Sequence, residues 1–331
     1  MLTNQKSATA RRPLQRVIIG AELTDDAMRH LRATYPDVVF DVVNDPASEA
    51  GFGDADAIIG WRLTKEQLAN SPRLQWLQTT SAGVERVLTP EMNERGIVIT
   101  NASGVHSISI SEHIMAMMLA FGRGIPLLLK NQQRHVWRDE NPREEVFELY
   151  QQSLMVVGVG DIGIALGERA SGFGMNVIGV RRRMDLPQPG SFSEMIGTDA
   201  LEARLPDADH VAICLPLTND TKGLFSARMI DAMKPGAYIY NIGRGPIIDQ
   251  GALVQALLAG KLGGAGLDVT DPEPLPQDSP LWDMPNVLIT AHTSGSSPAY
   301  WERASEIVVE NIRRWQADEP LNNVIDLQHG Y

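Results

Sequence analysis

Three ionisable residues in the second half of the chain could together carry out chemistry on a small acid. Arg244 lies in the sequence Asn-Ile-Gly-Arg-Gly, Glu273 in Asp-Pro-Glu-Pro and His292 in Thr-Ala-His-Thr. Each lies near the end of an apolar run, where open α/β sheets place ligand chemistry. A lone arginine, glutamate or histidine there would more often be a surface charge, a solvated turn or a hydrogen-bonded loop residue. Together they supply a cation for a carboxylate, a proton donor near pH 7 and a group that keeps this donor protonated, as the reduction of a 2-keto acid requires.

A glycine-rich turn follows an apolar run near the middle of the chain, in the sequence Val-Val-Gly-Val-Gly-Asp-Ile-Gly. Gly158 allows the tight turn, Gly160 lets the backbone approach a pyrophosphate, and Gly163 permits close packing of the helix that follows. Asp161 and Ile162 open that helix and are assigned to the same cofactor site. Because a β-rich run precedes the turn and a second one follows the helix, the sequence predicts dinucleotide binding rather than an ordinary strand–helix turn.

Three consecutive arginines, Arg181, Arg182 and Arg183, follow the second of these runs. An NAD-preferring site would have a carboxylate for the ribose hydroxyls here, about 20 residues beyond the turn. A carboxylate would repel an extra ribose phosphate, whereas guanidinium groups would bind it through charge-assisted hydrogen bonds. A solvated basic loop is the alternative interpretation. We predict NADP(H) as the preferred cofactor, with NAD(H) as the second choice.

Parallel α/β sheets are the elements that must position these residues, because short β-rich runs alternate with helical stretches along the chain. A first series extends from 17–19 to 97–100, and a long stretch rich in Ile, Met and Leu at 106–121 suits a buried helix. A polar connector at 132–150 precedes a second series, whose six apolar runs match a doubly wound nucleotide-binding domain. The final amphipathic helix at 299–315 is expected to pack back on the first domain. The six runs are 154–157, 176–180, 210–214, 237–241, 264–269 and 287–290.

This organisation predicts an α/β protein of two Rossmann-like or flavodoxin-like domains with doubly wound parallel sheets. The length of 331 residues favours two domains, since the usual domain has about 100 to 200 residues. We expect a discontinuous substrate-binding (catalytic) domain, residues 1–103 plus 297–331, and a dinucleotide-binding domain, residues 104–296. The active site is expected in the cleft between them, where closure would exclude water.

The composition of the chain excludes some classes of binding partner and indicates a cellular location. The formal net charge of −12 disfavours phosphate backbones and anionic membranes, so neither a nucleic acid nor a membrane is expected as a partner. Cys214 is the only cysteine and cannot form an internal disulfide, which favours a reducing compartment. The polar N-terminal segment, residues 1–16, has no apolar signal-peptide core, and apolar runs are far shorter than the roughly 20 residues that cross a bilayer. The cytoplasm is the expected location.

These motifs, in this order, resemble the D-2-hydroxyacid dehydrogenase family, which includes glyoxylate/hydroxypyruvate reductases, phosphoglycerate dehydrogenases and D-lactate dehydrogenases. The resemblance runs from about Ala57 to Val309. Its most specific stretches are Leu-Pro-Leu-Thr at 215–218, Met-Lys-Pro-Gly-Ala at 233–237 and Gly-Leu-Asp-Val at 266–269, together with the arginine, glutamate and histidine motifs described above.

The resemblance implies a role for each residue of the set. Arg244 would bind the substrate carboxylate and polarise the keto oxygen, and His292 would be the acid–base group, held by Glu273, which would raise its pKa. In this mechanism a nicotinamide cofactor delivers hydride to the keto carbon while the imidazolium of His292 protonates the oxygen. The remaining residues that the resemblance assigns to the cofactor are Asp268, on the nicotinamide carboxamide side, and Leu215, Pro216 and Ile242, which would line it.

The sequence indicates the residues that contact the substrate less directly than those that contact the cofactor. A loop over 81–85 resembles the one whose backbone N–H groups bind the substrate carboxylate, with Ala82 and Gly83 as candidates, although Ser81 and Glu85 replace the more frequent Gly and Asp. Trp61 could line the substrate pocket or cap it. Trp137 resembles a tryptophan that glyoxylate reductases send into the partner subunit's site, and simple interface packing is the alternative.

Glyoxylate or hydroxypyruvate is therefore the expected substrate, and a homodimer the expected assembly. The alternatives are a non-catalytic dinucleotide-sensing scaffold or corepressor, and a phosphoglycerate or other 2-hydroxyacid dehydrogenase that uses NAD. Two other enzyme classes fit the sequence less well. Formate enzymes of this type usually carry Gln where Glu273 stands, and L-specific lactate dehydrogenases have their glycine turn near the N-terminus, whereas here it lies in mid-chain.

A metal site is not expected. His106 and His113 lie seven residues apart, close to one helical face and with Glu112 adjacent, but no third ligand or zinc-type spacing accompanies them. We interpret them as structural or domain-contact residues.

Overall fold

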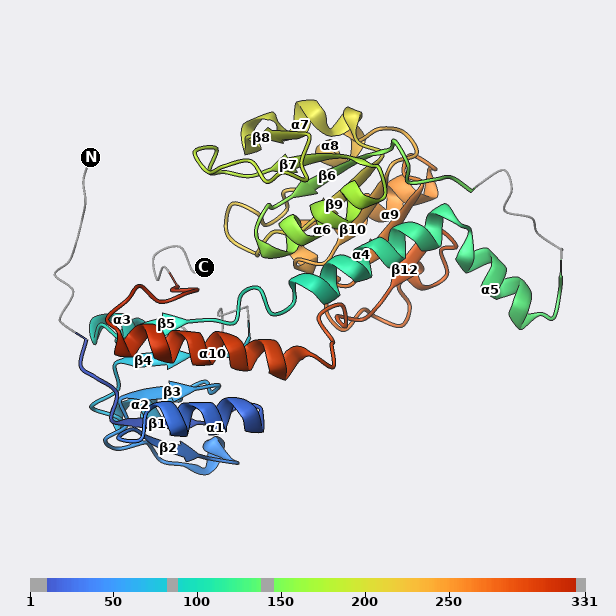
Figure 1. The fold of residues 1–331 in the computed structure, drawn as a ribbon. Helices are drawn as coiled ribbons and strands as arrows, with labels where there is room; N and C mark the ends of the chain where they lie inside the picture. Colours follow the sequence, from blue (N-terminus) through green and yellow to red (C-terminus); the bar gives the residue numbers. More distant parts are fainter. Residues whose placement is uncertain (1–10, 82–88, 138–145, 326–331) are drawn as a thin grey trace. The chain divides into compact units, whose positions relative to one another are not determined.

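The computed structural model describes residues 11–81, 89–137 and 146–325. The chain forms two compact units, the first comprising Met1–Val105 with Ser297–Tyr331 and the second comprising His106–Ser296 (Figure 1). Each unit contains one sheet, and every strand pair in both sheets is parallel. The predicted α/β class with two doubly wound sheets is thereby confirmed.

The first unit has a five-stranded sheet in the order β2-β1-β3-β4-β5, which is the flavodoxin-like order. Its strands are β1 (Arg16–Ile19), β2 (Val39–Val42), β3 (Ala57–Ile59), β4 (Trp76–Gln78) and β5 (Val98–Thr100). Its helices are α1 (Asp25–Thr34), α2 (Lys65–Ala69), α3 (Pro90–Glu94) and α10 (Tyr300–Gln316), with a short 3-10 turn η1 (Pro46–Ser48).

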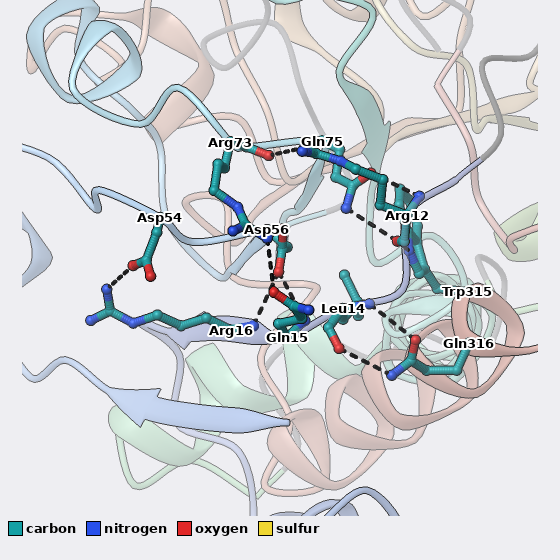
Figure 2. Close-up of polar contacts among 10 residues, drawn as sticks. All are labelled: Arg12, Leu14, Gln15, Arg16, Asp54, Asp56, Arg73, Gln75, Trp315 and Gln316. Carbon is teal, nitrogen blue, oxygen red and sulfur yellow. Dashed lines mark hydrogen bonds and ion pairs between the residues drawn. The ribbon is translucent and has the colours of Figure 1, made fainter. Parts of the chain in front are cut away.

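Helix α10 belongs to the first unit, although about 200 residues separate it from β5 in the sequence. Its Trp315 stacks on Trp76 of β4 with ring centroids 5.3 Å apart, and both rings are almost fully buried. The Trp315 indole donates to the carbonyl of Arg12 at 3.0 Å, and the Gln316 amide bonds both the N–H and the carbonyl of Leu14 (Figure 2). The chain segment before β1 is thus held against the last helix.

A buried carboxylate secures the start of β1. Asp56 is 0% exposed, and its side chain accepts hydrogen bonds from the backbone N–H groups of Gln15 and Arg16. The guanidinium of Arg73 lies 3.1 Å from its other oxygen (Figure 2). Because a buried charge is costly unless it is paired and hydrogen-bonded, these three donors fix where β1 begins.

The second unit has a seven-stranded sheet in the order β12-β11-β10-β9-β6-β7-β8. The chain order reverses between β6 and β9, the switch point beside which doubly wound sheets bind dinucleotides. Its strands are β6 (Ser153–Val157), β7 (Asn176–Val180), β8 (Glu194–Ile196), β9 (His210–Ile213), β10 (Tyr238–Asn241), β11 (Gly264–Leu267) and β12 (Val287–Ile289). Six of them match the predicted runs. The edge strand β8 was not predicted, because it has three residues of which only Ile196 is buried.

The helices of the second unit are α4 (Ser107–Gly122), α5 (Ile125–Gln133), α6 (Asp161–Gly172), α7 (Leu201–Arg204), α8 (Ala227–Ala232) and α9 (Gln250–Leu258). Short 3-10 turns are η3 (Thr198–Ala200), η4 (Leu205–Asp207), η5 (Gly245–Ile247) and η6 (Pro280–Trp282). Helices α4 and α6 pack side by side (Figure 1). The predicted burial of the apolar helix is confirmed, since Met115, Met117 and Met118 of α4 are at most 4% exposed.

Among the described residues, no single helix has the length and apolar composition needed to cross a membrane. Helices α4 and α5 meet that test only when taken together, and a bend of 71° separates them.

A buried aromatic cluster lies around the first residue of β9. His210 is 0% exposed, and its ring stacks on Tyr238 and Tyr240 of β10 with centroids 5.5 and 5.9 Å apart. Its Nε2 lies 2.6 Å from the Gln152 side-chain oxygen and its Nδ1 lies 3.1 Å from the Tyr240 hydroxyl. Burial lowers the pKa of His210 to about 4, with Asp209 partly opposing the shift. The ring is therefore neutral in the folded protein at pH 5 to 7.

This burial predicts a loss of stability in mild acid. An unfolded chain, with a histidine pKa near 6.5, takes up a proton that the folded protein excludes, so the contribution of His210 is complete above pH 6.5 and falls as the pH approaches 4. Between pH 7 and pH 5 the loss should be about 2 kcal/mol, since one pKa unit corresponds to about 1.4 kcal/mol. Urea denaturation of wild type and His210→Phe at both pH values measures it. Equal pH dependence in the two proteins would show that His210 is charged in the folded state.

Candidate active site

The glycine turn joins β6 to α6 at the carboxyl end of the sheet. Gly158 has φ +106°, and a Cβ there would lie 2.7 Å from the carbonyl oxygen of Cys214. A Cβ at Gly163 would lie 2.2 Å from the carbonyl oxygen of Gly158. A Cβ at Gly160 would meet nothing within 4 Å, and Gly160 directly precedes α6, whose first turn contains Asp161 and Ile162. Two glycines thus close the turn, while the third faces open space beside a helix N-terminus, which fits a dinucleotide.

The three arginines follow β7 immediately, but they do not share one environment. The Arg181 guanidinium is half-buried and donates to the carbonyl oxygens of Leu186 and Pro187, so it holds the loop in which it lies. Arg182 and Arg183 are exposed. The structure therefore gives Arg181 a loop partner that the sequence did not reveal, and its contact with a cofactor stays a prediction.

The residues proposed for chemistry follow three neighbouring strands. Arg244 comes after β10, Asp268 directly follows β11, and His292 comes after β12. In the sheet, Asn241 of β10 pairs with Leu267 of β11, which pairs with Ile289 of β12. Because these strands are parallel and in register, their carboxyl ends bring all three segments to the same edge as the glycine turn.

His292 and Glu273 form a direct pair. Nδ1 of His292 lies 3.1 Å from Oε2 of Glu273, and both side chains are about half exposed, at 52% and 41%. The other carboxylate oxygen of Glu273 accepts the backbone N–H of Thr270 at 3.2 Å, which orients the carboxylate. With Nδ1 directed to Glu273, Nε2 is the nitrogen left to exchange a proton with a ligand.

The carboxylate of Asp268 organises the segment that carries His292. Asp268 is 2% exposed, and its Oδ1 accepts from the Thr290 hydroxyl at 2.7 Å and the Thr293 N–H at 2.9 Å. Its Oδ2 accepts the Ser294 hydroxyl at 2.5 Å, and its carbonyl accepts the His292 N–H at 2.6 Å. A contact between Asp268 and the cofactor stays a prediction, whereas its contacts within the protein hold the loop. The hydroxyl groups of Thr290 and Ser294, which flank His292, are part of the site that sequence reasoning missed.

The Arg244 loop is braced by a buried amide at the end of β10. The Asn241 side chain accepts the N–H of Gly243 and donates to the carbonyl of Arg244, each at 3.0 Å. Nη1 of Arg244 donates to the carbonyl of Gly243 at 2.8 Å, and the arginine is half-buried. Asn241, 1% exposed, is a second residue that sequence reasoning missed, although a polar residue ending an apolar strand was a signal for it.

The remaining residues that the sequence assigned to the cofactor or the substrate lie in several different parts of the structure. Leu215 and Pro216 follow β9, where the Leu215 side chain lies against the Gly158 turn, and Ile242 after β10 is 6% exposed. Trp61 lies after β3, with its indole N–H 3.4 Å from the Gln67 side chain. Trp137 follows α5 and is 91% exposed. Ala82 and Gly83 lie outside the described residues.

In the described parts of the chain, no group of three or more His, Cys, Asp or Glu side chains could hold a metal ion, and the interpretation of His106 and His113 as structural residues stays a prediction. Nε2 of His113 lies 2.9 Å from the Thr290 hydroxyl, and Nδ1 of His106 lies 3.0 Å from the Gly295 carbonyl oxygen. Both therefore contact the segment around His292. Burial raises the pKa of the Cys214 thiol to about 12, so this residue is not a thiolate nucleophile at neutral pH.

Taken together, the switch-point turn and the histidine–glutamate pair at one sheet edge define a dinucleotide-binding fold with a titratable pair beside it, as dehydrogenases have. Residues 115–294 match the model of the D-isomer specific 2-hydroxyacid dehydrogenase, NAD binding domain. The chain belongs to this family of NAD(P)-dependent oxidoreductases, which act on CH–OH groups.

The chain is similar in sequence to known enzymes of two kinds. It is 31% identical over 321 residues to a glyoxylate/hydroxypyruvate reductase B of Pectobacterium atrosepticum, covering 94% of this chain and 98% of the relative. It is 34% identical over 280 residues to a D-3-phosphoglycerate dehydrogenase of Methanocaldococcus jannaschii, covering 83% of this chain and 52% of the relative, so the match spans about half of that longer protein.

A solved structure supports the same fold over almost the whole chain. The NADPH-dependent glyoxylate/hydroxypyruvate reductase of Sinorhizobium meliloti, in complex with NADP and sulfate, superposes with a TM-score of 0.78 at 27% identity. The match covers 96% of this chain and 100% of that one.

The different surroundings of Gly160 and Gly163 predict separable effects. Gly163→Ala should lower the free energy of unfolding by about 1 to 3 kcal/mol, because its methyl group would overlap the Gly158 carbonyl. Gly160→Ala should change it by less than about 0.5 kcal/mol, since the added methyl group meets only open space, yet it should weaken dinucleotide binding. Thermal unfolding without ligand and NADPH titration followed by fluorescence measure the two effects. Unimpaired NADPH binding by Gly160→Ala would argue against this turn as the pyrophosphate site.

Proposed function

We propose that this protein reduces a small 2-keto acid to the D-2-hydroxy acid, with glyoxylate or hydroxypyruvate as substrate and NADP(H) as the preferred cofactor. The observation that carries the proposal is the 3.1 Å contact between His292 and Glu273 at the carboxyl edge of a dinucleotide-binding sheet. Orientation and charge stabilisation would supply most of the rate enhancement.

His292 acts as the acid–base residue in this proposal. Its Nδ1–H donates to Glu273, which fixes the ring plane. Nε2 then donates its proton to the keto oxygen during reduction and takes it back during oxidation. When bound, the nicotinamide cofactor would supply or accept the hydride.

Arg244 acts as the anion-binding residue. A guanidinium can bind a carboxylate in a bidentate geometry and can also polarise a neighbouring keto oxygen. The brace from Asn241 fixes the backbone from which the side chain extends. Such a local cation is needed because the chain has a net charge of −12, which by itself repels an anionic acid.

The cofactor preference rests on the arginines after β7. Arg182 and Arg183 are exposed at the position where an NAD-preferring enzyme would have a ribose-binding carboxylate. They supply charge for the 2′-phosphate of NADP(H), while Arg181 braces their loop. The Sinorhizobium reductase is NADPH-dependent, which is consistent with this preference.

A homodimer is proposed from the surface of α5. Ile125, Leu128 and Leu129 are 41% to 52% exposed on this helix, and Trp137 beyond it is 91% exposed. Such apolar surface on a soluble enzyme marks an interaction site. A second copy covers it in this proposal, and Trp137 reaches towards the partner's site.

The alternative enzyme is a phosphoglycerate or other 2-hydroxyacid dehydrogenase that uses NAD, which the 34% identity to the Methanocaldococcus enzyme favours. Initial rates with NADPH and NADH, measured with glyoxylate, hydroxypyruvate, pyruvate, phenylpyruvate, 2-ketoisocaproate and 3-phosphohydroxypyruvate, separate the two. NADPH should be preferred, and Arg182→Ala with Arg183→Ala should raise the KM for NADPH by about 10- to 100-fold, the loss expected for charge-assisted hydrogen bonds. Arg228→Ala, which removes an exposed arginine paired with Glu202, is the control and should leave it unchanged. A preference for NADH would indicate that Arg181, Arg182 and Arg183 belong to a surface loop that does not select the cofactor.

Substitution of the two proposed substrate-contacting residues should give different kinetic signatures. His292→Ala should lower kcat by about 10²- to 10⁴-fold, the usual contribution of an acid–base group. Arg244→Ala should both raise the KM for the keto acid and lower kcat, because the guanidinium acts in binding and in the transition state. Near-full activity of His292→Ala would refute the assignment, and tight NADPH binding with no turnover by wild type would favour a dinucleotide-sensing scaffold.

A further inference from the structure

Two histidines, His106 at the N-cap of α4 and His113 within it, contact the two ends of the segment that contains His292. His113 reaches Thr290, two residues before His292, and His106 reaches Gly295, three residues after it. His106, which caps α4, and His113 are seven residues apart, about two helical turns or roughly 10 Å along the axis. Helix α4 and its N-cap residue therefore contact both ends of the loop from 290 to 295.

The direction of the hydrogen bonds at His113 follows from its partners. The Thr290 hydroxyl donates its one proton to the Asp268 carboxylate at 2.7 Å, because a carboxylate only accepts. The Thr290 oxygen must then accept from His113, so Nε2 of His113 carries a proton and donates across 2.9 Å. A directed chain runs from His113 through Thr290 to Asp268, whose carboxylate also receives the N–H groups of Thr293 and Ser294.

The contact at His106 has a defined direction too. A carbonyl oxygen only accepts, so Nδ1 of His106 carries a proton and donates to Gly295. The Ser109 hydroxyl lies 3.3 Å from the same carbonyl oxygen and 3.3 Å from that of His106. A Cβ at Gly295 would lie 3.0 Å from Nδ1 of His106, so glycine allows the imidazole to approach the backbone this closely.

The segment between these contacts has a backbone conformation that needs support. Ala291 and His292 have φ values of +48° and +58°, in the left-handed region. For residues with a Cβ this conformation is unfavourable, because the Cβ approaches the backbone too closely. It persists only where surrounding contacts determine it, and here the contacts come from Asp268 and α4.

We propose that His113 is a positioning residue that sets the place of His292 through Thr290 and Asp268, with His106 fixing the far end of the same loop. The inference rests on the proposed function, in which His292 transfers the proton. Helix α4 then positions the acid–base residue in addition to packing in the core. A displacement of His113 or His106 would move the backbone of His292.

Four variants test the chain of hydrogen bonds. His113→Leu removes the donor and keeps much of the side-chain volume, whereas His113→Gln keeps an N–H donor at similar reach. Thr290→Val is nearly isosteric and breaks the chain without altering α4, so it serves if His113→Leu does not fold. Glu112→Gln is the control on the same helical turn, where the carboxylate pairs with Arg169 instead of the loop.

Kinetics with NADPH and the best keto acid give the first readout. His113→Leu and Thr290→Val should lower kcat by about 10- to 100-fold, since a displacement on the order of 1 Å can cost that much. The KM for NADPH should change by less than about twofold in the same variants, and His113→Gln should recover most of kcat. The double variant should be little worse than either single one, because both changes break one chain. Equal loss in His113→Leu and His113→Gln would show that packing alone matters and would overturn the proposal.

Hydrogen exchange of the ligand-free protein gives a readout that does not depend on turnover. The amides of Thr293 and Ser294 should exchange faster in His113→Leu and Thr290→Val than in wild type, His113→Gln or Glu112→Gln. Unchanged exchange in both variants would overturn the proposal. If wild type reduces none of the acids, the proposed function fails, and the exchange rates still decide whether α4 positions this loop.

Discussion

The buried carboxylate of Asp268 holds together the part of the structure on which the proposed chemistry depends. Removing a charge from water costs several kcal/mol unless hydrogen bonds replace the lost solvation. Here the donors all come from residues 290–294, so the stabilisation of one charge determines the path of the whole segment. The left-handed backbone at Ala291 and His292 follows from this arrangement. Asp56 plays a comparable part in the first unit, where its carboxylate fixes the start of β1.

Parallel pairing supplies the second constraint. The proposed catalytic residues are far apart in the sequence, but β10, β11 and β12 are neighbours in register and end at one edge. A side chain placed just beyond each strand therefore reaches the same region whatever connects the strands. This explains why a glycine turn, an arginine and a histidine with its glutamate, although more than a hundred residues separate the first from the last, lie at one edge of the sheet.

Polar side chains that form hydrogen bonds within the protein hold the loops at this edge. Asn241 braces the Arg244 loop, Thr290 joins Asp268 to α4, and Arg181 holds the loop beyond β7. Each satisfies backbone or side-chain groups that would otherwise be exposed or unpaired in a loop. Preorganisation of this kind is what lets a half-exposed histidine keep one orientation.

The sequence by itself determined the features that depend on local pattern. The glycine turn, the alternation of apolar runs and helices, and the positions of Arg244, Glu273 and His292 after apolar runs could all be read from neighbouring residues. The structure places Arg244 and His292 just beyond β10 and β12, and Glu273 in the longer segment that follows β11. Their roles stay predictions. The edge strand β8 was not predicted because only Ile196 of its three residues is buried, so no apolar run marks it, and α3 and α5 were not predicted either.

Only the tertiary structure decided which distant groups meet. Nothing near Arg181 in the sequence indicates its partners, yet its guanidinium donates to the carbonyls of Leu186 and Pro187. The pairing of His113 with Thr290 joins residues 177 positions apart, and that of His106 with Gly295 joins residues 189 apart. Such contacts arise from the packing of a helix on the ends of strands, which no local pattern records, because the hydrogen-bond partner of a side chain is set by the fold around it.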